Sequence, residues 1–196
     1  MALGSRMFAE SVRPELRAAR DWLVLALSVL ILAGLFAFAV VVGRMPPFDR
    51  FVTDPLFFKR CLVAHVNLAL VVWFYSFIAG LLCLLPARGP GDAWARGAAR
   101  VSALGVLLMV AGTALPAGQP LLSNYIPTIS NPLFGFGQLV FALGVLASLA
   151  GRRLAAPAAA ARLRIPDAAA AWLTATAAAL VLAALTLALT RLAEPA

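Results

Sequence analysis

Long runs of apolar residues alternate with short polar stretches along the whole chain. A helix needs about 20 predominantly apolar residues to cross the hydrocarbon core of a bilayer, and five runs reach or approach this length. The pattern predicts an all-α, polytopic membrane protein with about five transmembrane helices in a single transmembrane domain, residues 1–196. The predicted helices cover residues 22–43, 61–85, 98–117, 133–150 and 168–190.

Proline residues mark several boundaries between these runs. Pro46 and Pro47 follow the first run, and Pro86 follows the second. Proline fixes its own φ and has no backbone N–H to donate, so it is poorly tolerated inside a helix. Pro116 lies near the end of the third run and Pro120 just after it, which makes the end of that helix the least well defined.

The composition agrees with membrane insertion. Apolar residues make up 63% of the chain and charged residues 12%, and the mean hydropathy is +0.96. Soluble domains are nearer half apolar and a quarter charged. A net charge of +8 would suggest nucleic acid in a soluble protein, but here the basic residues gather between the apolar runs. We therefore expect membrane lipid, and no nucleic acid, as a partner.

The basic residues also predict an orientation, because cytoplasmic loops carry an excess of Lys and Arg. With a cytoplasmic N-terminus, eleven of the 16 basic residues lie on the cytoplasmic side and five on the opposite side. The first 21 residues contain charges and no long apolar run, so they do not resemble a cleaved signal peptide. The C-terminus is then expected on the periplasmic side.

The stretch FFKRCLVAHVNLAL, residues 57–70, contains the single histidine of the chain, His65. It lies about five residues beyond Lys59 and Arg60, or ~8 Å along a helix. An ionisable residue inside a membrane is costly and marks a candidate functional site. Imidazole is a common ligand of heme iron, zinc and copper.

The helical neighbours of His65 form an apolar face that suits a flat porphyrin. Zinc or copper would need more N, S or O ligands, and only Cys61 is near enough to supply one. Two other roles stay open for His65: a structural hydrogen bond to a neighbouring helix, with Asn67 and Ser76 as further polar positions, and a proton path. The neighbours at three, four and seven residues are Cys61, Leu62, Leu68, Ala69 and Val72.

Two stretches resemble a known superfamily. The stretch FFKRCLVAHVNLALVVWFYSFIAGLLCLLP resembles the second transmembrane helix of subunit I of the heme-copper oxidases. This superfamily includes cytochrome c oxidases and nitric-oxide reductases. SNYIPTISNPLFGFGQLVFALGVL looks like the external loop and fourth helix of divergent, C-family-like members. The resemblance implies that His65 is one axial ligand of a low-spin b-type heme in respiratory electron transfer. It also implies that the protein is located in the inner (cytoplasmic) membrane of a bacterium.

The resemblance covers only the N-terminal half of such a subunit. The second axial histidine and the three copper-binding histidines of the superfamily have no counterpart here, because His65 is the only histidine. No residue of this chain is therefore expected to be catalytic. At most, the chain contributes to a terminal oxidase or nitric-oxide reductase, together with other oxidase subunits or a second copy of itself. The alternative is a non-catalytic membrane scaffold or assembly subunit with no cofactor.

The basic residues near His65 have two possible roles, and the two cysteines have no predicted role. Arg50, Lys59 and Arg60 could pair with heme propionates, but we expect them to act as interfacial anchors whose long stems reach along apolar surface. Cys61 and Cys83 lie 22 residues apart in one predicted helix, roughly 33 Å at 1.5 Å per residue. They cannot form a disulfide within that helix.

Overall fold

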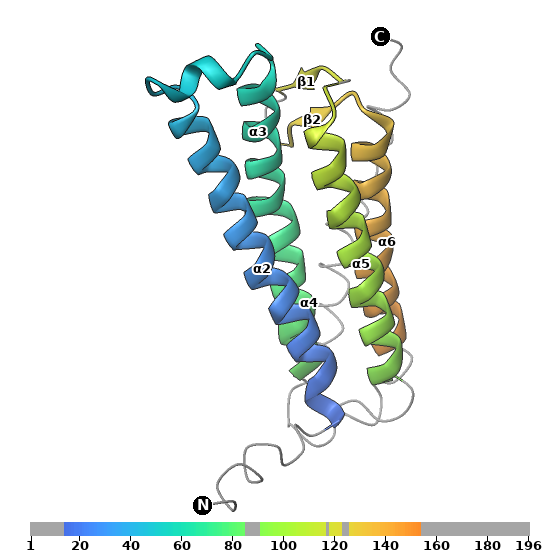
Figure 1. Ribbon diagram of the computed structural model, residues 1–196. Coiled ribbons are helices and arrows are strands. Elements are labelled where there is room, and N and C mark those ends of the chain that lie inside the picture. Colours follow the sequence, from blue (N-terminus) through green and yellow to red (C-terminus); the bar gives the residue numbers. More distant parts are fainter. Residues whose placement is uncertain (1–13, 85–90, 117, 123–125, 154–196) are drawn as a thin grey trace, which may run out of the picture.

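A computed structural model of the chain describes residues 14–84, 91–116, 118–122 and 126–153. The described residues are mostly helical and form an antiparallel helical bundle with a small hairpin at one end (Figure 1). The predicted fifth helix, residues 168–190, lies outside these ranges. The elements in chain order are α2 (Pro14–Val42), the 3-10 helix η1 (Phe48–Phe51), α3 (Phe57–Val66), the π-helical turn η2 (Asn67–Val72), α4 (Trp73–Leu84), α5 (Gly91–Ala114), β1 (Pro120–Leu121), β2 (Thr128–Ile129) and α6 (Pro132–Arg153).

Four helices in the described part are long and apolar enough to cross a membrane, by length and composition. This confirms the all-α expectation for these residues. α3, η2 and α4 follow one another without a break and form a single long rod. The four candidate spans are Leu16–Val42, Phe57–Leu84, Ala93–Ala114 and Pro132–Gly151.

The helices extend beyond the predicted spans at their N-terminal ends. The first begins at Pro14 rather than 22, the second at Phe57 rather than 61, and the third at Gly91 rather than 98. Hydropathy marks only the stretch that fits the bilayer core, whereas arginine and lysine are good helix formers and continue the helix past it. The third helix ends at Ala114 rather than 117, because a residue that precedes proline disfavours the helical conformation.

Glycines bring α5 and α6 into close contact. A Cβ atom placed on Gly105 would lie 2.7 Å from the carbonyl oxygen of Gly137, and one placed on Gly112 would lie 2.6 Å from the backbone nitrogen of Phe134. Only glycine leaves room for such an approach of two helix backbones. The Ser102 hydroxyl also donates a hydrogen bond to the Phe141 carbonyl across this contact, at 3.1 Å.

The other pair, α2 with the α3–α4 rod, completes the bundle. Trp22 and Val29 of α2 are buried in a common core with Leu68, Val72 and side chains of α5 and α6. α2 nevertheless keeps a wide apolar outer face, because only 17% of its most apolar window is buried, against 44–50% in the other three spans. An apolar face of this kind is expected of a helix that borders lipid.

The hairpin closes one end of the bundle, which we call the hairpin end. β1 pairs with β2 antiparallel, with Pro120 opposite Ile129 and Leu121 opposite Thr128. Ile129 is 1% exposed, so the hairpin anchors itself in the core. The Asn131 side chain accepts a hydrogen bond from the Leu133 N–H at 2.9 Å and thereby caps the start of α6.

Candidate functional site

His65 lies on α3, half-buried, and faces α2. Its Nδ1 atom is 2.9 Å from the carbonyl oxygen of Ala33. A carbonyl can only accept a hydrogen bond, so this contact requires the Nδ1 atom to carry the proton. In the neutral ring the Nε2 atom then has a lone pair. Among the described residues, no hydrogen bond occupies Nε2.

The residues of the apolar face that the sequence predicted beside His65 differ in their burial. Cys61, Leu68 and Val72 are at most 2% exposed and belong to the core or its edge, whereas Leu62 is 42% exposed. The π-helical turn at Asn67–Val72 explains part of the difference, because its wider turn rotates later residues relative to a regular α-helix.

A buried amide network starts two residues after His65. Asn67 is 0% exposed, and its Nδ2 atom donates to the carbonyls of Val63, at 3.0 Å, and Pro127, at 2.6 Å. Its Oδ1 atom accepts a hydrogen bond from Nε2 of Gln138 at 2.9 Å. The network joins the α3–α4 rod, the segment before β2, and α6. Asn67 was expected as a polar position in its helix, but nothing in the local sequence indicated Gln138 or Pro127 as its partners.

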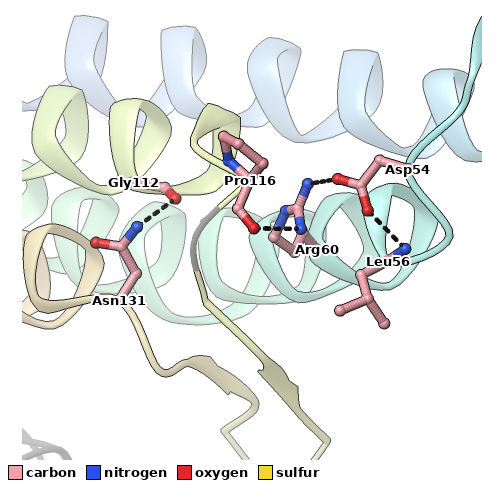
Figure 2. A network of polar contacts seen from close by, with 6 residues as sticks. All are labelled: Asp54, Leu56, Arg60, Gly112, Pro116 and Asn131. Carbon is pink, nitrogen blue, oxygen red and sulfur yellow. Dashed lines mark hydrogen bonds and ion pairs between the residues drawn. The ribbon is translucent and has the colours of Figure 1, made fainter.

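Arg60 occupies a second buried polar cluster, at the hairpin end (Figure 2). Its side chain is 3% exposed and forms an ion pair with Asp54. Its Nη1 atom also donates to the Pro116 carbonyl at 3.5 Å, and Asp54 accepts the Leu56 N–H at 2.9 Å. The Arg60 hydrogen bond, followed by the Leu56 N–H, lowers the pKa of Asp54 from its ordinary value.

The arginine cluster corrects one expectation from sequence. Arg60 was expected to be an interfacial anchor, but its guanidinium is buried and paired within the fold. The ion-pair partner, Asp54, lies six residues earlier in a non-helical segment, and the carbonyl that accepts the other hydrogen bond, Pro116, lies 56 residues later. Arg50 and Lys59 are exposed, as anchors would be.

Among the described residues, no group of three or more His, Cys, Asp or Glu side chains could hold a metal ion. Cys61 and Cys83 are buried and not disulfide-bonded, in agreement with their predicted separation. His65 is the one histidine of the chain and offers a single imidazole nitrogen.

Comparison with known proteins gives two relatives. The chain is 35% identical over 126 residues to an uncharacterized protein of Aquifex aeolicus, an alignment that covers 63% of this chain and 31% of the relative. It is 27% identical over 150 residues to the uncharacterized protein RP382 of Rickettsia prowazekii, with 65% and 29% covered. The chain thus spans about a third of the length of these relatives. No protein-family model and no solved structure matches it.

The fold and the site define a class of protein: a helical chain whose described part has four segments long and apolar enough to cross a membrane. A single histidine and a buried amide network lie on these helices.

Proposed function

We propose that this chain is a heme-copper-oxidase subunit I-like integral membrane protein in which His65 is an axial ligand of a low-spin b-type heme. Its role would be electron transfer in a respiratory chain, with the N-terminus cytoplasmic. One observation carries the proposal: the ring of His65 is oriented by its Nδ1 hydrogen bond to Ala33, and its Nε2 atom has no partner among the described residues.

This arrangement suits a histidine that binds metal. Metal-ligating histidines usually donate the second ring N–H to a backbone carbonyl or a carboxylate, which sets the tautomer and the orientation of the ring. The Ala33 carbonyl is placed to do this for His65. His65 is half-buried, and its ring contacts α2 through Nδ1.

The remaining parts of a heme site would come from outside these 196 residues. The chain contains no second histidine, and its alignments cover only 31% and 29% of its relatives. Further helices, another oxidase subunit, or a second copy of this chain with its own His65 are the candidate sources of the second axial ligand. A bound heme would supply a one-electron carrier, and His65 and Ala33 would set its orientation and the basicity of its nitrogen ligand.

The test is optical. The protein, purified from its native membrane with whatever it associates with, is expected to give a reduced-minus-oxidised spectrum with a b-type signal. His65→Ala should abolish the signal, and added imidazole should restore part of it. Gln138→Ala, a control that removes a polar group of the same bundle, should keep the signal. A colourless wild-type protein from heme-replete cells contradicts the proposal.

A non-catalytic scaffold or assembly subunit is the second candidate, and the same hydrogen bond favours it. In that case the Nδ1 contact of His65 joins α2 to α3 and needs no ligand at Nε2. His65→Ala would then lower the thermal stability of a colourless protein. The two candidates separate on whether the wild-type protein carries heme, and the stability of the variant alone does not distinguish them.

A further inference from the structure

The segment that connects α2 to α3 has an unusual surface. Three of its apolar side chains are exposed: Met45 by 53%, Phe48 by 51% and Phe51 by 80%. In Figure 1 this segment lies at the hairpin end and extends away from β1 and β2. Large exposed aromatic side chains are costly in water, and aromatic residues of membrane proteins are enriched at the membrane–water interface.

Exposed cations lie between these apolar side chains. Arg44 and Arg50 belong to the same segment, and Lys59 follows in the first turns of α3. The Arg44 guanidinium lies over the ring of Phe58, 5.4 Å from its centroid. A stacked guanidinium keeps the N–H donors at its edge available, and these match the geometry of phosphate.

The acidic residues of this region do not balance the exposed cations. Asp54 is already paired with the buried Arg60, which leaves Asp49 as the one other acid between α2 and α3. The exposed part of the segment therefore carries a net positive charge next to its aromatic side chains. The apolar outer face of α2 continues into it, since Phe38 is 65% and Val41 is 59% exposed.

We infer that residues 44–51, together with Lys59, bind anionic phospholipid headgroups. Phe48 and Phe51 insert at the level of the glycerol backbone, while Arg44, Arg50 and Lys59 contact the phosphates. The segment thus anchors the α2–α3 pair in the membrane surface on the hairpin side. The inference rests on the membrane-spanning part of the proposed function and does not depend on heme.

Depth measurements test the insertion of Phe51. A nitroxide is attached at Phe51→Cys in a Cys61→Ala, Cys83→Ala background, and the protein is reconstituted in phosphatidylglycerol–phosphatidylcholine vesicles. The label is expected to be more accessible to oxygen than to a water-soluble nickel chelate, as is a label at Phe38→Cys on the outer face of α2. A label that the nickel chelate reaches freely, or one that neither quencher reaches because another protein covers it, overturns the inference.

A comparison of anionic with zwitterionic vesicles tests the headgroup contact. Phosphatidylglycerol is expected to raise the unfolding temperature above that in phosphatidylcholine alone. One basic residue near an anionic surface changes lipid affinity by about fivefold, so Arg44→Gln with Arg50→Gln should remove most of this increase. Arg100→Gln, an exposed arginine on α5, should keep it. An increase that survives the double substitution contradicts the headgroup contact.

Flotation separates this inference from its premise. If the wild-type protein does not float with the vesicles, the membrane-spanning proposal itself fails. If it floats but the Phe51 label lies in water, only the lipid contact fails.

Discussion

Gln138 on α6 donates its side-chain amide to the buried oxygen of Asn67, 71 residues earlier in the chain, at 2.9 Å. Asn67 opens the π-helical turn and uses its own amide N–H groups for the carbonyls of Val63 and Pro127. One side chain therefore connects the α3–α4 rod to α6 and to the segment before β2. Such a network lies among apolar residues, where an amide without a partner would be costly.

Removal of the Asn67 side chain is expected to destabilise the bundle. Asn67→Ala leaves the Pro127 carbonyl and the Gln138 amide without their partner, at a cost of about 1–3 kcal/mol. Thermal unfolding in detergent, followed by circular dichroism, measures the change. Thr113→Val is the matched control, because the Thr113 hydroxyl donates a hydrogen bond within its own helix, to the Met109 carbonyl at 2.9 Å. Equal losses in the two variants would contradict a role for the network in joining helices.

The same network allows a double-mutant cycle. Asn67→Ala and Gln138→Ala share one hydrogen bond, so their effects on the free energy of unfolding should not add. Coupling between polar side chains of membrane helices averages about 0.6 kcal/mol and reaches about 1.7 kcal/mol. Strictly additive losses would mean that the 2.9 Å contact contributes nothing to stability.

Substitution of Gly105 should separate α5 from α6. The Cβ atom of Gly105→Ala would lie 2.7 Å from the Gly137 carbonyl oxygen and 2.8 Å from the Phe141 Cα atom. Both are backbone atoms that cannot move alone, so we expect a loss of about 1–3 kcal/mol from overpacking. Gly34→Ala is the control, since nothing lies within 4 Å of its added Cβ. It should be neutral or slightly stabilising, because alanine is the better helix former.

Acid should weaken the Asp54–Arg60 cluster. The pKa of Asp54 is lowered from 3.8 in the folded protein, first by the Arg60 hydrogen bond and then by the Leu56 N–H. The unfolded chain therefore takes up the proton before the folded one does. The stabilisation is complete above the ordinary aspartate pKa and is lost as the pH falls through the lower, folded value.

A pH series of thermal unfolding tests this prediction. Between pH 7 and pH 3 the wild-type unfolding temperature should fall more steeply than that of Asp54→Asn, which lacks the titrating group. Asp49→Asn, on the exposed 3-10 helix, should follow the wild type. A slope that does not change in Asp54→Asn would mean that this ion pair does not contribute to acid sensitivity.

The two cysteines give a simple test of the bundle. Cys61 and Cys83 are 2% and 4% exposed, so both thiols should react slowly with a water-soluble disulfide reagent in the folded protein. Two thiols per chain should react once the protein is unfolded in denaturant, because the pair is not bridged. Fast reaction of either thiol before unfolding would show that its helix does not pack as described.

Local sequence patterns account for the elements that depend on a few neighbouring residues. Apolar runs located the four described helices, and Pro116 explains the early end of α5. The apolar runs placed three helix starts too late in the chain, because the charged residues before each run continue the helix without adding hydropathy. Nothing in the periodicity indicated the π-helical turn at Asn67–Val72.

The sequence alone determined the apolar spans, their order, and His65 as the one imidazole among them. Only the tertiary structure decided what each polar side chain touches: His65 with Ala33, Asn67 with Gln138, and Arg60 with Asp54 and Pro116. The physical reason is the distance along the chain over which each effect acts. Hydropathy and helix propensity act over a few residues, whereas these contacts depend on how far the helices rotate about their axes and how closely glycine lets their backbones approach.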